Sequence, residues 1–150
     1  MPEHEAIGGE TFLTENSIRL FLRDADPAAN LLLDDLEFTP AEIQEAKELA
    51  VQKWNEMPPP VGIYHADRFP YRYHLLMGTS ALLMYMAANR YRRNDLKYDI
   101  GGGAIQDQAK AADYGQAGDR LMKEYMAWME QKKLQLNMED GFGFDQGHYF

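Results

Sequence analysis

An apolar stretch in the middle of the chain constrains its fold more than any other feature. From Tyr73 to Arg93 the sequence reads YHLLMGTSALLMYMAANRYRR, with no charged residue between Arg72 and Arg90. Apolar residues recur with helical spacing on three adjacent stripes, so no wide polar face remains, which is typical of a buried helix. We therefore expect a buried helix over about 71 to 93, with the rest of the chain packed around it.

The same stretch is a poor candidate for a membrane span. His74, Gly78, Thr79 and Ser80 interrupt it, and it is barely as long as the roughly 20 apolar residues that a span requires. We expect no membrane association.

Length and composition indicate one acidic domain. The chain has 150 residues, 45% of them hydrophobic, which suits a single domain over 1–150 with one core. The formal net charge of −9 argues against holding nucleic acid by neutralising phosphates. There are no cysteines, which excludes disulfides, thiolate zinc sites and thiol catalysis. The first residues lack the basic and apolar regions of a secretory signal, so we expect a protein that is made and kept in the cytoplasm or assembled from there.

Capping signals predict two helices before the central one. Thr14 can cap a short helix over 15–23. Thr39, followed by a proline and by Glu42, has the sequence of a capping box at the start of a helix over 40–56.

The second half of the chain begins with a different pattern. Residues 96–100 alternate apolar and charged side chains, a period of two that predicts a short strand. From 105 to 136 the helical period returns, with Gly115 and Gly118 as positions where the helix could bend or divide in two.

The two ends of the chain have no periodicity. Residues 1–13 and 137–150 are therefore expected to form arms. The predicted fold class is all-α: a mainly helical bundle with extended N- and C-terminal arms and at most a short β element.

No stretch carries the signature of a catalytic or metal site. The four histidines lack metal-ligand spacing, and neither Ser17 nor Ser80 lies in a nucleophile elbow. A calcium loop from Asp24 fails because Ala28 stands where an oxygen ligand is required, and the glycines at 101–103 lack the rest of a phosphate-binding motif. Carboxylates are plentiful, but nothing selects an acid and base pair among them. We expect no enzymatic activity, no cofactor and no metal.

One basic cluster lies at the end of the central helix, at Arg90, Arg92, Arg93 and Lys97. Cations at this end of a helix complement its dipole. They could also contact an acidic partner or DNA that passes close by. The three arginines are therefore candidate interaction residues.

The C-terminal arm is the most informative irregular segment. Ordering its glycine-rich backbone costs about as much free energy as burying its aromatic side chains returns. Main-chain hydrogen bonds to a neighbouring chain would make ordering of the arm favourable. The alternative interpretation is that the arm folds back on its own helices. The candidate interaction residues of the arm are Phe142, Phe144, His148, Tyr149 and Phe150.

Two long phrases of the chain resemble a known family. IRLFLRDADPAANLLLDDLEFTPAEIQEAKELAVQKWNEMPPP and LLMGTSALLMYMAANRYRRNDLKYDIGGG are similar to the head-to-tail adaptor (connector or neck) proteins of tailed bacteriophages. The resemblance implies a virion structural protein, made in the host cytoplasm, that forms a dodecameric ring between the portal protein and the tail or neck proteins. DNA would pass through the ring without sequence-specific binding.

An acidic subunit suits such a channel, because a wall that attracted phosphates would slow the DNA. Asp34, Asp35 and Glu37 are the candidate lumen-facing residues, with a solvated turn as the other interpretation. An acidic DNA mimic or inhibitor of a host factor would also be small, negative and helical. A third possible class is a carboxylate- or metal-dependent enzyme, but the sequence contains no motif of such an enzyme.

Overall fold

The computed structural model describes residues 13–26, 36–95 and 103–141. Its helices are α2 (Glu15–Leu22), α3 (Pro40–Glu56), α4 (Arg72–Asp95) and α5 (Gly103–Gly141), with a short 3-10 helix, η2 (Ala66–Arg68), before α4. The described part of the chain contains no strand, so the all-α prediction is confirmed there. The strand expected at 96–100 lies outside the described residues.

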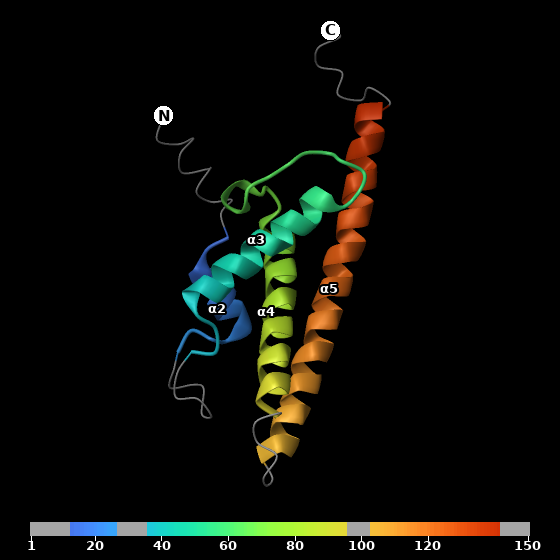
Figure 1. Ribbon diagram of the computed structural model, residues 1–150. Helices are drawn as coiled ribbons and strands as arrows, with labels where there is room; N and C mark the ends of the chain where they lie inside the picture. The colour runs from blue at the N-terminus through green and yellow to red at the C-terminus, as the bar shows by residue number, and fades with distance from the viewer. Residues whose placement is uncertain (1–12, 27–35, 96–102, 142–150) are drawn as a thin grey trace, which may run out of the picture.

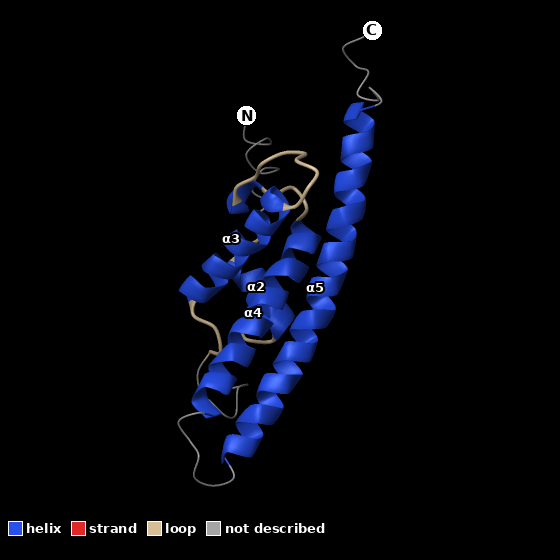
Figure 2. Ribbon diagram, turned by 45° about the vertical axis from the view of Figure 1, so that its right-hand side comes forward, coloured by secondary structure: helices blue, strands red, loops and turns tan. Residues whose placement is uncertain are grey.

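A long antiparallel hairpin of α4 and α5 forms the frame of the fold (Figure 1). α3 crosses α4 obliquely on one side, and the short α2 lies beside α3 and α4, as the turned view in Figure 2 also shows. The C-terminal end of α5 extends past the other helices. No helix in the described part of the chain is both long and apolar enough to cross a membrane.

The two capped helices begin where the sequence predicts. The Thr14 hydroxyl accepts a hydrogen bond from the Ser17 N–H at the start of α2. At α3 the capping box is complete, since the Thr39 hydroxyl accepts from the Glu42 N–H at 3.1 Å and the Thr39 N–H donates to the Glu42 carboxylate at 3.3 Å. α2 ends one residue earlier than expected because Arg23 adopts a left-handed conformation, with φ of 61°.

The central helix is buried as predicted, and small residues bring α5 close to it. A Cβ on Gly78 would lie 2.7 Å from Cε2 of the Tyr125 ring, and a Cβ on Gly118 would lie 2.9 Å from Cε1 of Tyr85. Each tyrosine ring therefore fills space that the glycine on the opposite helix leaves open. Gly118 and Gly115 do not divide α5, which runs unbroken for 39 residues.

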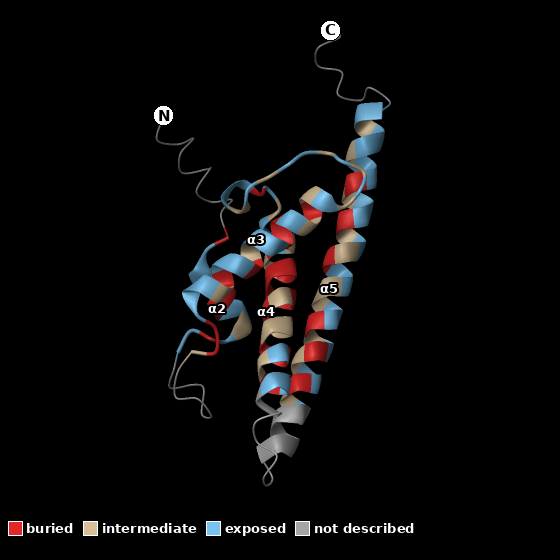
Figure 3. Cartoon of the chain, in the orientation of Figure 1, coloured by how far each residue is buried: buried red, intermediate tan, exposed pale blue. Residues whose placement is uncertain are grey.

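α5 also continues beyond its predicted end at residue 136. Residues 137–141 belong to the helix, so the first part of the expected C-terminal arm is helical. Figure 3 shows these last turns exposed, whereas the buried residues of α5 face the other helices. The expectation of an arm starting at 137 was wrong because the helix does not need packing partners on every turn to continue.

An aromatic cluster fills the junction of α3, α4 and α5. The fully buried Trp54 lies with its ring centroid 5.5 Å from those of Phe69, Tyr71 and Trp128. Lys133 is buried beside it, donates to the Met57 carbonyl and holds its ammonium 5.1 Å from the Trp54 ring centroid. The cluster therefore holds the segment between α3 and α4 against α5.

Candidate functional site

The segment that precedes α3 is held inside the fold by an ion-pair network. Arg90 Nη1 donates to Glu37 Oε1 at 3.0 Å, Arg90 Nη2 donates to the Glu42 carboxylate at 3.0 Å, and the Tyr91 hydroxyl donates to Glu37 Oε2 at 3.2 Å. Asp24 completes the network, since its carboxylate accepts from the backbone N–H of Glu37 at 2.6 Å. These contacts join the end of α2, the start of α3 and the C-terminal half of α4.

This network corrects one of the predictions for the acidic cluster. The side chain of Glu37 is only 6% exposed and is turned toward Arg90, so it is not available to line a channel. Sequence reasoning missed its burial because the partner arginine is 53 residues away. Asp34 and Asp35 lie outside the described residues.

The basic cluster divides into one internal and two external arginines. Arg90 is paired with two carboxylates of its own chain. Arg92 and Arg93 are exposed, and Arg93 borders a shallow hollow of about 360 Å³ that Met86 also lines. Only these two remain open to a partner in the described chain; Lys97 lies outside it, as do all five candidate residues of the C-terminal arm.

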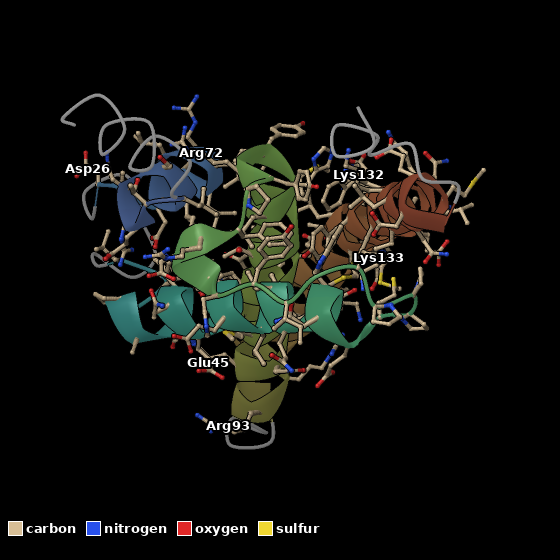
Figure 4. All side chains as sticks on the ribbon, turned by 90° about the horizontal axis from the view of Figure 1, so that it is seen from above. Asp26, Glu45, Arg72, Arg93, Lys132 and Lys133 are labelled. Atoms are coloured by element: carbon tan, nitrogen blue, oxygen red, sulfur yellow. The ribbon has the colours of Figure 1, made fainter. Side chains whose placement is uncertain are left out.

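A hollow that the sequence did not reveal lies between α2 and the start of α4. Its volume is about 370 Å³, and we call it the α2–α4 hollow; its lining residues are Leu13, Ser17, Arg72, Tyr73 and Leu76. The Tyr73 side chain is 65% exposed at its rim, and Leu20, one turn beyond Ser17 on α2, is 55% exposed. Seen from above, Arg72 lies on the α2 side of α4, away from Lys132 and Lys133 on α5 (Figure 4).

Arg72 is the polar group of this hollow. Its Nη2 donates to the Ser17 hydroxyl at 2.8 Å, and no carboxylate pairs with it within the described residues. Arg19 and Arg90, by contrast, each pair with two carboxylates. No sequence signal identifies Arg72, because its environment depends on where α2 packs.

A second exposed apolar feature lies on the projecting end of α5. Leu134 and Met138 are 56% and 47% exposed and are four residues apart, hence on one face of the helix. No other described helix covers this face. It leads directly into the segment that begins at residue 142.

A further hollow, of about 510 Å³, lies between α3 and η2 and is mostly polar. Asn55 lies on its wall, where its side-chain amide donates from Nδ2 to the Tyr64 carbonyl and accepts at Oδ1 from the Tyr64 N–H, so its main role is to hold the loop. His65 and Asp67 also line it, but no serine, threonine or lysine lines it with them among the described residues. We assign no chemistry to this hollow.

The titratable groups with shifted pKa values serve packing. Burial, and then the hydrogen bond to Asp119, raises the pKa of Tyr85 to about 12. Burial also raises the pKa of Tyr91 and Tyr125, and the Tyr125 hydroxyl donates to the Ala50 carbonyl at 2.6 Å. Burial lowers the pKa of Lys133 and of His74, which stacks on the indole of Trp128.

Within the described residues, no group of three His, Cys, Asp or Glu side chains is arranged to hold a metal ion. Lys133 is a desolvated amine, but its side chain has no exposed surface through which a substrate could reach it. The surfaces that remain open to ligands are therefore the α2–α4 hollow, the exposed arginines and the end of α5.

The described residues form a small all-α fold with exposed apolar and basic surfaces. Comparisons with protein-family models, with curated proteins and with solved structures gave no match to this chain.

Proposed function

We propose that this chain is a structural protein of a tailed-phage virion: the head-to-tail adaptor, forming a ring between portal and tail around the DNA channel. Its neighbours would be further copies of itself, the portal protein and the tail or neck proteins, and it would need no cofactor and catalyse no reaction. It would be made in the host cytoplasm and function in the virion.

The observation that carries this proposal is the projecting end of α5. α5 continues past the bundle with Leu134 and Met138 exposed. These apolar side chains would contribute burial energy only if another surface covered them. The nine residues that follow Gly141 include four aromatic side chains. Such an end suits contact with another subunit.

The charge of the chain agrees with passage of DNA. A ring of subunits that each carry a net charge of −9 repels phosphates and would not retard DNA in its channel. The competing class, an acidic DNA mimic, requires carboxylates spread over one surface. Asp24 and Glu37 are buried and Glu42 is paired with Arg90, so these three do not contribute to such a surface.

Mass spectrometry of purified particles tests the proposal most directly. The protein should be present at the same copy number as the portal protein, and its absence from particles would refute the adaptor function. Binding to a host DNA-binding protein, with no trace in particles, would favour the inhibitor instead.

A truncated chain that ends at Gly141 tests the role of the tail. The cut is placed there because residues 137–141 belong to α5. The truncated chain should melt like the full chain but fail to form rings or to attach to particles, as judged by electron microscopy. A truncated chain that melts several degrees lower yet still assembles would show that the tail belongs to its own core.

A further inference from the structure

We propose that the α2–α4 hollow receives the segment Phe142-Gly143-Phe144-Asp145 of a neighbouring copy. The inference rests on the proposed function, since a closed ring requires that a segment of one copy fit a different surface on the next. In this heterologous contact, one copy contributes an aromatic and acidic segment, and the next copy contributes an apolar hollow that contains one arginine.

The size and lining of the hollow suit an aromatic side chain. A cavity of roughly 150 Å³ is sufficient to hold a benzene ring, and the α2–α4 hollow measures about 370 Å³. Leu13 and Leu76 provide apolar walls, and the exposed ring of Tyr73 offers a face for a second ring. An aromatic residue that enters would cover the exposed ring of Tyr73 and the partly exposed Leu76.

The charge of the hollow suits an acidic ligand. Arg72 has a hydroxyl partner but no carboxylate within the described residues, in a chain where acidic residues outnumber basic ones. Asp145 directly follows Phe144, so a ring in the hollow would bring a carboxylate near the guanidinium. Gly143 allows the bound backbone to approach closely.

Geometry assigns this contact to a second copy. Trp128 stacks on His74 at 4.0 Å between ring centroids, which places it level with the start of α4 and the hollow. Gly141 is thirteen residues further along α5, about 20 Å at 1.5 Å per residue. The four residues 142–145 span at most about 14 Å. Asp145 would therefore approach Arg72 of its own chain only with this segment fully extended back along α5, so we assign the contact to a second copy.

The N-terminal segment 1–12 is the competing occupant, because it joins the described chain at Leu13 on the wall of the hollow. We favour the tail because it sets two aromatic residues beside a carboxylate, whereas segment 1–12 contains a single aromatic residue. The peptide experiment below distinguishes segment 1–12 from the tail as the occupant.

A charge exchange in the full-length chain tests the contact. Sedimentation velocity would compare the wild type with Arg72→Glu, Asp145→Arg and the double variant, after thermal melts confirm that each is folded. Each single variant should weaken self-association about tenfold or more, and the double variant should restore it, because every copy then offers both exchanged charges. Arg68→Glu, the same change at an exposed position on η2, is the control and should leave association unchanged.

A fluorescent peptide of residues 142–150 gives a readout that does not require the ring. Its anisotropy should rise with wild-type chain and respond about tenfold more weakly to Arg72→Glu. Equal binding by both would overturn the proposal, as would a peptide that binds only after residues 1–12 are removed. If Arg72→Glu and Asp145→Arg both still form rings as the wild type does, the docking is overturned but the adaptor function is kept. If the protein is absent from particles but its peptide binding still depends on Arg72, the adaptor function is overturned and the docking is kept.

Discussion

The ring of Tyr125 lies directly against the backbone of Gly78, so that a Cβ at Gly78 would be only 2.7 Å from Tyr125 Cε2. The ring cannot retreat easily, because it is fully buried and its hydroxyl is bonded to the Ala50 carbonyl on α3. One glycine thereby sets the distance between α4 and α5 and also allows α5 to reach α3.

Gly78→Ala should therefore destabilise the protein. Alanine in a helix normally gains about 0.5 to 1 kcal/mol over glycine, whereas overpacking a core costs about 1 to 3 kcal/mol. The overpacking should dominate, and chemical denaturation should show a loss of about 1 to 2 kcal/mol. Gly115→Ala is the matched control, since a Cβ there meets only the mobile end of Arg92, and it should be neutral or stabilising. An equal gain for both would contradict the close contact.

Leu83→Asp should prevent folding. Leu83 has no exposed surface in the middle of α4, and an aspartate there would bury a carboxylate without a cation. Circular dichroism should show lost helicity or a collapsed melting transition. If the variant melts like the wild type, α4 is not the centre of the core.

Arg90→Ala should cost about 2 kcal/mol, less than the roughly 3 to 5 kcal/mol typical of a fully buried ion pair, because the Arg90 side chain is 29% exposed. The buried carboxylate of Glu37 would lose its cation, and Glu42 would lose the link from α3 to α4. Urea unfolding would measure the change. Arg93→Ala, at an exposed position on the same helix, should alter stability by less than about 0.5 kcal/mol. Similar losses for the two variants would mean that the network contributes little.

Ser80→Ala should stabilise the protein by about 1 kcal/mol. The Ser80 hydroxyl is fully buried and has no hydrogen-bond partner within the described part of the chain, and an unsatisfied buried polar group costs about 1 to 3 kcal/mol. Alanine also has the higher helix propensity. Ser17→Ala, which removes a hydroxyl bonded to Arg72, should give no such gain. A melting temperature that falls for Ser80→Ala would indicate that the hydroxyl has a partner.

Alkaline pH should unfold the protein. The folded-state pKa of Tyr85 is raised to about 12, above the value of about 10 for an unfolded tyrosine, so its contribution to stability is complete below pH 10. It is lost as the pH rises from about 10 toward 12, and Tyr91 and Tyr125 act in the same direction. The lowered pKa of Lys133 acts in the opposite direction. Burial disfavours its charged form, so stability increases as the pH rises toward the pKa of lysine in the unfolded chain.

Urea unfolding at a series of pH values would measure this loss. Tyr85→Phe should flatten the decline above pH 10, because phenylalanine has no proton to release. A stability that stays level from pH 10 to 12 in the wild type would show that these tyrosines are not buried in the folded state.

The parts of the fold that depend on neighbours in sequence were predictable. The capping box at Thr39 is complete because its two hydrogen bonds join residues three apart, so both partners can be read from one short phrase. The burial of α4 followed from the lack of a wide polar face before Asn89. The all-α class followed from the same periodicity.

The parts that depend on distant residues were decided by the tertiary structure. Gly118 could have marked a break in α5, but it faces Tyr85 on another helix, and its missing side chain serves packing instead of dividing the helix. Glu37 could have been a solvated carboxylate, but Arg90, 53 residues later, turns it inward. The α2–α4 hollow exists only because α2 packs beside the start of α4. A single sequence shows the preferences of each segment within a few residues, whereas the contacts that give Gly118, Glu37 and Arg72 their roles arise only when segments far apart in the chain meet.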